Sequence, residues 1–223
     1  MADAGESGEM AMRQRGWERF APLGALGFLA SLVLGALAVG ASPPAGDAPA
    51  EEIATYFEEH QGGHLANTFL AALGSLVFYP WFLASLWQTI RRVEGPDGLC
   101  APAALIGGIA LLIPLVVQLA AWGAAALQAG EQRDPAVAAA LFDLGSTGFL
   151  VSPFPAAVLV IAATLASRPS GSLLPNWLVR LGLPLAAVML LGTFLGLAQF
   201  MFVLFAVWLI SVAIVLMRSN PSA

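Results

Sequence analysis

The stretch WLVRLGLPLAAVMLLGTFLGLAQFMFVLFAVWLISVAIVLM, residues 177–217, decides the fold class. Its only charged side chain is Arg180. One helix needs about 20 apolar residues to cross a bilayer, and this run is about twice that long. It therefore predicts two spans joined by a tight turn, which we place between Gly192 and Gln199. We expect one helix over 177–195 and the next over 198–217.

Four more apolar runs precede this pair and predict spans at 20–41, 66–88, 103–127 and 146–166. The chain is 59% hydrophobic and only 10% charged, whereas soluble domains are about 25% charged. A fold in water would lack the polar side chains to cover its surface. The sequence thus predicts an all-α, polytopic membrane helix bundle with six transmembrane helices. We expect a single domain over 20–218, with a disordered tail at 1–19 and a short tail at 219–223.

Short interfacial helices are expected in the two longer outer loops. In the first loop, Ile53, Tyr56 and Phe57 share one helical face, and the pair Gly62–Gly63 is expected to end the helix. In the second loop, Asp134-Pro135 is typical of a helix start, and predicts a short helix over 136–144. A straight helix over 135–166 would be about 48 Å long, against about 30 Å of hydrocarbon. We therefore expect a bend or break near Gly145.

The arginines predict the orientation. All nine Lys and Arg positions are Arg, and the six-span model places eight of them on one side. They are Arg13, Arg15, Arg19, Arg91, Arg92, Arg168, Arg180 and Arg218, with only Arg133 opposite. The positive-inside rule then puts both termini in the cytoplasm. A cleaved signal peptide is the alternative for 20–41, but its apolar core would be only about 7–15 residues long.

The main cluster of candidate metal ligands is expected at the outer face: Glu59, His60, His64 and Asp143, with Asn67 nearby. Imidazole and carboxylate groups bind zinc and similar divalent metals. The spacing of His60 and His64 puts both on one face only if the segment is helical, and two glycines lie between them. The alternative is a pair of interfacial histidines beside an acidic, solvated loop.

A second candidate site is a pocket between kinked helices. Prolines inside the expected spans remove backbone donors, and the freed carbonyls must find partners or face a cavity. The prolines are Pro80, Pro114, Pro153 and Pro155, and the polar residues that would line the pocket are Ser75, Tyr79, Gln118, Ser152 and Gln199. Broken helices around a pocket are typical of transporters. Ordinary kinks in a membrane helix are the alternative.

Glycines recur in the expected spans, at Gly24, Gly27, Gly35, Gly107, Gly108 and Gly123 and in the pair Gly192 and Gly196. Such positions let helices approach closely. We expect this packing to lie within one chain and not between two copies.

Several function classes are disfavoured. The absence of lysine excludes a Schiff base, and the single Cys100 excludes a disulfide or a cysteine metal cluster. No nucleotide-binding loop or HExxH motif is present, so we expect no cofactor. No charge falls at mid-membrane, which argues against a proton pump or ion carrier. We expect the lipid bilayer as partner and no nucleic acid.

The favoured function is a non-enzymatic carrier of a small neutral or lipophilic solute, or a membrane-complex subunit. A metal-dependent membrane enzyme is the alternative.

Four segments carry a resemblance over residues 20–218: EEIATYFEEHQG, DPAVAAALFDLG, LPNWLVRLGL and FAVWLISVAIVLMR. In these segments the chain resembles a family of uncharacterised actinobacterial multi-pass membrane proteins. The resemblance implies a six-span topology and a bacterial inner membrane. It implies no activity and no active-site residue.

Overall fold

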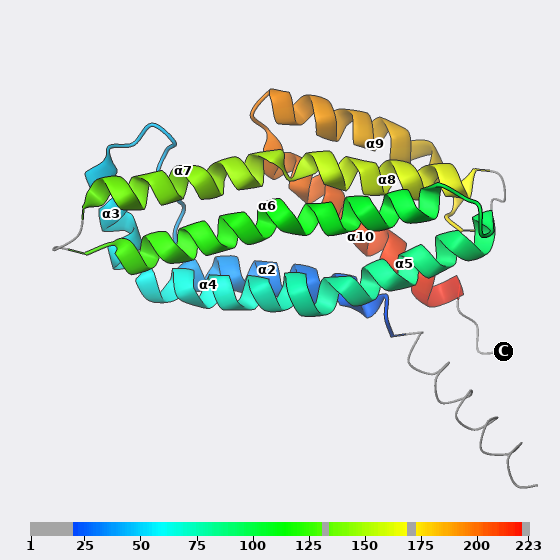
Figure 1. Ribbon diagram of the computed structural model, residues 1–223, viewed down its shortest axis with the longest axis horizontal. Helices are drawn as coiled ribbons and strands as arrows, with labels where there is room; N and C mark the ends of the chain where they lie inside the picture. Colours follow the sequence, from blue (N-terminus) through cyan, green and yellow to red (C-terminus); the bar gives the residue numbers. More distant parts are fainter. Residues whose placement is uncertain (1–19, 131–133, 169–172, 220–223) are drawn as a thin grey trace, which may run out of the picture.

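The computed structural model describes residues 20–130, 134–168 and 173–219, and every regular element in these ranges is a helix (Figure 1). The elements are α2 (Leu23–Val39), α3 (Ala50–Glu59), α4 (Gln61–Leu73), the π-helix η1 (Gly74–Phe78), α5 (Tyr79–Glu94), α6 (Cys100–Gln128), α7 (Pro135–Val151), α8 (Pro153–Ser167), α9 (Asn176–Phe194) and α10 (Ala198–Ser219).

Three long rods lie side by side: α4–η1–α5, α6 and α7–α8 (Figure 1). α2 packs along α4, and the α9–α10 hairpin packs on α8. Within the described ranges, five helical segments are long and apolar enough to cross a membrane: Gln61–Glu94, Cys100–Gln128, Pro135–Ser167, Asn176–Phe194 and Ala198–Arg218. α2 is equally apolar but has 17 residues, the lower limit of the usual range for a span. The predicted all-α membrane helix bundle is confirmed.

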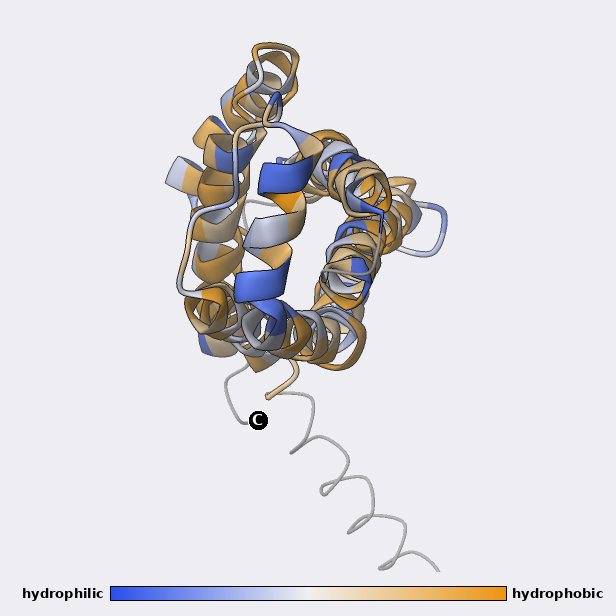
Figure 2. Cartoon of the chain, turned by 90° about the vertical axis from the view of Figure 1, so that its left-hand side faces the viewer, coloured by the Kyte–Doolittle hydropathy of each residue, from blue (hydrophilic) through white to orange (hydrophobic). Residues whose placement is uncertain are grey.

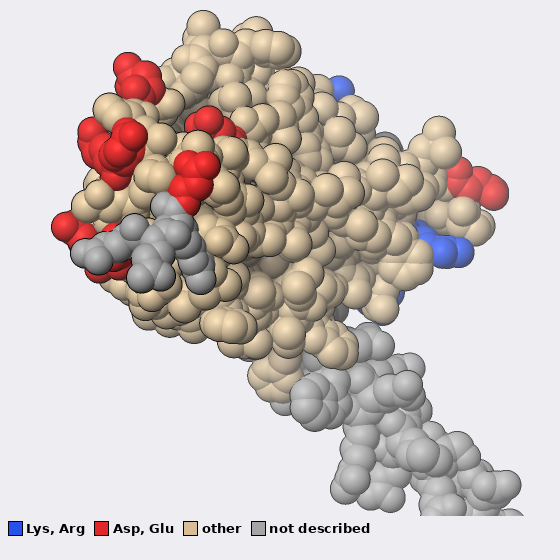
Figure 3. All heavy atoms as spheres, turned by 60° about the vertical axis from the view of Figure 1, so that its left-hand side comes forward, with Lys and Arg blue, Asp and Glu red and all other residues tan. Residues whose placement is uncertain are grey.

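Charged residues divide between the two ends of the bundle (Figure 3). We call one the acidic end; its described charged residues are Asp47, Glu51, Glu52, Glu58, Glu59, Asp134 and Asp143. The other is the arginine end, with Arg91, Arg92, Arg168, Arg180 and Arg218, and with Glu94 and Asp97 among them. The three long rods hold 34, 29 and 33 residues, or about 51, 44 and 50 Å. Each exceeds the roughly 30 Å thickness of the hydrocarbon core, so the rods are long enough to reach into the headgroup regions.

The expected stop at Gly62–Gly63 is wrong. α3 does end at Glu59, but the chain turns only at His60 and both glycines lie inside α4. A Cβ on Gly63 would lie 2.5 Å from the carbonyl oxygen of Ala38 and 2.7 Å from the Cα of Val39. α4 therefore packs backbone against backbone on the end of α2, which only glycine permits. The glycine is needed for packing and does not end the helix.

The expected break at Gly145 is also wrong, and the helix expected over 136–144 is not separate. α7 continues through Gly145 to Val151, and the interruption falls at Ser152, just before Pro153. Proline removes the backbone donor that would continue the ladder, so a new helix starts there. Gly145 instead makes room for the ring of Trp122 on α6. The predicted helix start is confirmed, because Asp134 accepts a 3.0 Å hydrogen bond from the Ala136 backbone.

The turn between the last two helices falls where it was predicted. α9 ends at Phe194 and α10 begins at Ala198, with Gly196 at φ +74° in the left-handed region. The expected packing of glycines within the chain is also seen. A Cβ on Gly24 or Gly27 of α2 would meet Phe78, and one on Gly35 would meet Asn67. These glycines allow α2 to pack closely against the α4–η1–α5 rod.

Two separate apolar cores hold the described part of the structure together. The larger one fills the bundle between α2, α5, α6, α8, α9 and α10. The smaller one lies at the acidic end and consists of Ile53, Tyr56, Phe57, Ala125, Ala126 and Phe142. It joins α3 to the end of α6 and the start of α7, and we call these three segments the aromatic cap. Figure 2, viewed from the acidic end, shows α3 lying across the mouth of the bundle.

Candidate functional site

The aromatic cap encloses one histidine. His64 lies on the first turns of α4 and is 1% exposed. Its ring centroid is 4.6 Å from that of Phe57, 5.3 Å from that of Tyr56 and 6.1 Å from that of Trp122. These rings come from α3 and α6, so the histidine is held where three helices meet.

Two polar groups where the cap meets α4 have no hydrogen-bond partner among the described residues. They are the His64 imidazole, at both of its nitrogens, and the Tyr56 hydroxyl. A buried polar group without a partner costs about 1–3 kcal/mol. Burial also raises the pKa of Tyr56 above its ordinary value, so the hydroxyl keeps its proton and can donate. By contrast, Trp122 is satisfied, because its Nε1 donates to the Phe142 carbonyl at 3.2 Å. The His64 imidazole and the Tyr56 hydroxyl can therefore form hydrogen bonds with a bound molecule.

These groups line a cavity of about 350 Å³, which we call the His64 cavity. Its polar lining comes from Tyr56, His64, Asn67, Gln118 and Trp122. The rest of its wall is apolar and comes from α2 and the loop after it, α6, α7 and α10. Among the residues that the structure describes, no Asp, Glu or Arg lines the cavity. A neutral, largely apolar molecule with one or two hydrogen-bonding groups fits this chemistry.

The four predicted metal ligands are only partly brought together. His60 and His64 both lie close to the Tyr56 ring, with centroids 4.9 and 5.3 Å away. His60 uses its Nδ1 to donate to the Tyr56 carbonyl at 2.8 Å. Glu59 and Asp143 are exposed to solvent. Within the described ranges, no three His, Cys, Asp or Glu side chains are grouped so that they could hold a metal ion.

The five predicted pocket residues differ in burial and in whether they line the His64 cavity. Gln118 lines the His64 cavity, together with Asn67 from the predicted polar cluster. Ser75, Tyr79 and Ser152 are fully buried in the bundle, and their hydroxyls have no partner in the described part of the chain. None of the three lines this cavity, and Gln199 is exposed at the start of α10. Of the five, Gln118 alone lines the His64 cavity, and a pocket formed by the other residues stays a prediction.

Sequence reasoning missed the aromatic part of the site. On α6, Leu115, Gln118, Leu119 and Trp122 all line the cavity. Their spacing of three and four residues is that of one helical face. Trp122 lies four residues after Gln118 on this face, so helical spacing from Gln118 could have predicted that Trp122 also lines the site. Phe149 and Phe202 also line the cavity, but they come from distant segments and carry no comparable local signal.

The fold and the cavity define a class: an integral membrane helix bundle with an aromatic cap over a pocket at one end. No protein-family model, no curated protein and no solved structure matches the chain.

Proposed function

We propose that this protein binds a small, uncharged and mostly apolar molecule in the His64 cavity, as a carrier or membrane receptor for it. One observation supports this above all: His64 is 1% exposed, lines the cavity and leaves both ring nitrogens without a partner in the described structure. A polar side chain that is buried at such a cost and lines a cavity is better explained by ligand binding than by packing.

The chemistry of the cavity limits the ligand. A neutral imidazole donates from one nitrogen and accepts at the other, so it can pair with a hydroxyl or a carbonyl. The Tyr56 hydroxyl and the amides of Asn67 and Gln118 offer further pairs. The absence of charged lining residues disfavours an ion. A volume of about 350 Å³ lies near the lower end of the roughly 300–1,000 Å³ range of small-molecule pockets.

The proposal includes an orientation. We place the arginine end in the cytoplasm, together with both termini, and the acidic end outside. The described arginines support this, because all of them lie at one end of the bundle. The His64 cavity would then lie near the outer surface of the membrane. A bacterial inner membrane and kinship with the actinobacterial family remain predictions from the resemblance.

A pair of matched substitutions on α2 tests the proposal. Ala36 lines the cavity, whereas Ala30 is exposed on the same helix and does not. The full chain would be purified as wild type, Ala36→Phe and Ala30→Phe, and small molecules extracted from each would be quantified by mass spectrometry. We expect one neutral compound at near-stoichiometric amount in the wild type and in Ala30→Phe. Ala36→Phe fills the cavity and should lose it. No enriched compound in the wild type, or equal amounts in Ala36→Phe, would overturn the proposal.

A further inference from the structure

The His64 cavity extends along the bundle axis from the middle of the molecule to the aromatic cap. On α6 its lining runs from Leu115, one residue past the middle of this 29-residue helix, to Trp122. These two residues are seven positions apart, or about 10 Å. His64 lies beside Trp122, with ring centroids 6.1 Å apart. With α6 centred in a hydrocarbon core about 30 Å thick, the cavity would extend from the midplane through most of one leaflet.

The polar and apolar parts of the lining lie at different depths. Tyr56 comes from α3, which lies across the mouth of the bundle, and His64 packs against it (Figure 2). The opposite end of the cavity is apolar, with Leu115, Phe149 and Phe202. Phe149 lies two residues before the middle of the 33-residue α7–α8 rod, and its ring centroid is 5.7 Å from that of Phe202. The hydrogen-bonding groups are thus near the membrane surface, and hydrocarbon side chains line the deeper part.

One side of the cavity opens at the surface of α2. Val33 and Ala36 line the cavity and are nevertheless exposed, Val33 by 58%. α10 extends only from the middle of the bundle to the arginine end, so it does not cover this part of α2 (Figure 1). α2 carries no charged residue, so its exposed surface suits lipid. The opening continues to the loop after α2, where Ala41 and Pro43 line the cavity and are exposed as well.

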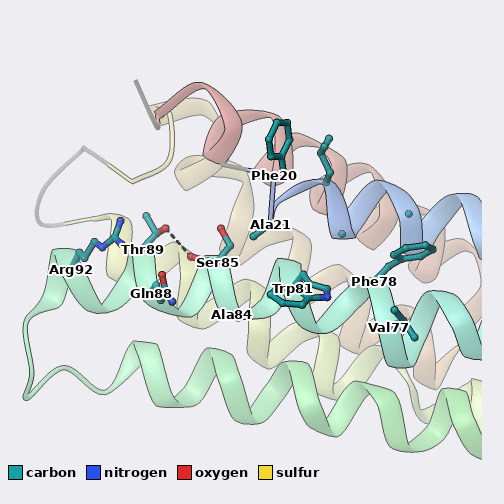
Figure 4. A pocket seen from close by; sticks show the side chains of 13 residues that line it. Phe20, Ala21, Val77, Phe78, Trp81, Ala84, Ser85, Gln88, Thr89 and Arg92 are labelled. Carbon is teal, nitrogen blue, oxygen red and sulfur yellow. Dashed lines mark hydrogen bonds between the residues drawn. The ribbon is translucent and has the colours of Figure 1, made fainter. Parts of the chain in front are cut away.

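A larger cavity of about 600 Å³ lies at the arginine end, between the start of α2 and α5, and differs in its polar lining (Figure 4). There, the Thr89 hydroxyl donates to the Ser85 carbonyl at 2.8 Å, and Arg92 also has an interaction partner. Of these two cavities, only the His64 cavity is lined by buried side-chain polar atoms without a partner in the described part of the chain. A ligand is therefore sought at the His64 cavity.

We propose that the occupant of the His64 cavity is a neutral lipid with a single hydrocarbon chain, of the monoacylglycerol type, which enters sideways from the leaflet at the acidic end. This inference rests on the proposed function and names the class of its ligand. Hydroxyl and ester groups of the lipid pair with His64 and Tyr56, because an imidazole and a phenol can each donate and accept. The chain lies along Leu115 and Phe149. A charged headgroup is disfavoured, since the described lining offers no charge to pair with it.

Two adjacent positions on α2 give a matched test. Val33 and Leu34 are 58% and 55% exposed, but only Val33 lines the cavity. Benzoylphenylalanine would replace each in turn in the full chain, in phosphatidylcholine nanodiscs that contain a minor fraction of mono-olein. Lipid adducts formed on illumination would be identified by mass spectrometry. We expect adducts at position 33 to be enriched in mono-olein about fivefold over those at position 34, as a modest binding preference would give. The same lipid composition at both positions would overturn the proposal.

A second substitution tests the polar contact. His64→Phe, combined with benzoylphenylalanine at position 33, should abolish the enrichment in mono-olein, because a phenyl ring forms no hydrogen bond with the headgroup. Enrichment that survives this change would contradict the proposal.

The extraction assay with Ala36→Phe separates this inference from the proposed function. A single-chain neutral lipid that is lost in Ala36→Phe is the expected result. A water-soluble compound lost in the same variant would overturn this inference alone and leave the proposed function standing. No enriched compound in the wild type would overturn both.

Discussion

The imidazole of His64 and the ring of Phe57 lie 4.6 Å apart, although the two residues belong to different helices. The turn at His60 changes the direction of the chain between α3 and α4 and brings these rings together. The contact links the aromatic cap to the rods below it. It also buries a histidine in an apolar shell, where its nitrogens have no partner among the described residues.

Replacing His64 by Phe should stabilise the ligand-free protein and abolish binding. A phenyl ring keeps the contacts with Tyr56, Phe57 and Trp122, and it removes two unsatisfied nitrogens that cost about 1–3 kcal/mol. At about 2–4 °C per kcal/mol for a chain of this size, the melting temperature should rise by several degrees. Thermal unfolding in detergent and the extraction assay above measure the two effects. His64→Ala is the control, because it opens a hole and should lower the melting temperature. A fall in melting temperature for His64→Phe equal to that for His64→Ala would contradict the prediction.

Gly62 and Gly63 should respond in opposite directions to the same change. A Cβ at Gly62 meets nothing within 4 Å, whereas one at Gly63 meets the backbone of Ala38 and Val39. Gly62→Ala should stabilise by about 0.5–1 kcal/mol, because alanine favours the helix. Gly63→Ala should destabilise, because backbone atoms must shift to admit the methyl group. Unfolding of the two variants side by side checks this, and equal effects would mean that α4 and α2 are farther apart.

Glu94 should stabilise the start of α6. Its carboxylate accepts hydrogen bonds from the backbone nitrogens of Ala101 at 2.9 Å and Cys100 at 3.2 Å. A carboxylate at a helix N-terminus also complements the helix dipole. Glu94→Ala should cost about 1–2 kcal/mol in unfolding free energy. Asp97→Ala, in the same loop and exposed, should have little effect. If both variants lose the same stability, the capping interaction is not formed.

The topology can be measured with single cysteines. Cys100 is the only native cysteine, so Cys100→Ala provides the background. Glu58→Cys should react in intact cells with a membrane-impermeant maleimide, because the acidic end faces outward in our proposal. Asp97→Cys should react only after permeabilisation. Both residues are exposed, so access from one side is the variable tested. Labelling of both positions from the same side would rule out a bundle that crosses the bilayer in this way.

The fold class could be predicted because it depends on local sequence. The predictions that were wrong concern features that depend on contacts with distant parts of the chain. Long apolar runs and the start at Asp134-Pro135 lie within one segment, so the sequence alone could place them. The roles of Gly63 and Gly145 depend on Ala38 and Trp122, which lie elsewhere in the chain. Glycine is compatible with both a helix break and a close contact, and only the packed neighbour decides between them.

The candidate site was half predictable for a related reason. His64 and Gln118 stand out as polar residues in apolar surroundings, and both line the cavity. Asp143 was grouped with His64 as a candidate metal ligand in sequence reasoning, but α7 turns Phe142 inward and leaves Asp143 exposed. The direction in which a side chain points depends on how its helix packs. The sequence predicted a break near Gly145, whereas α7 continues through it to Val151.

An experimental structure of the purified full chain in a lipid nanodisc tests the central claim most directly. We predict density for a small molecule in the His64 cavity, with a polar atom about 2.7–3.2 Å from a ring nitrogen of His64. A cavity that is empty or collapsed, with His64 paired to another side chain, would contradict the claim.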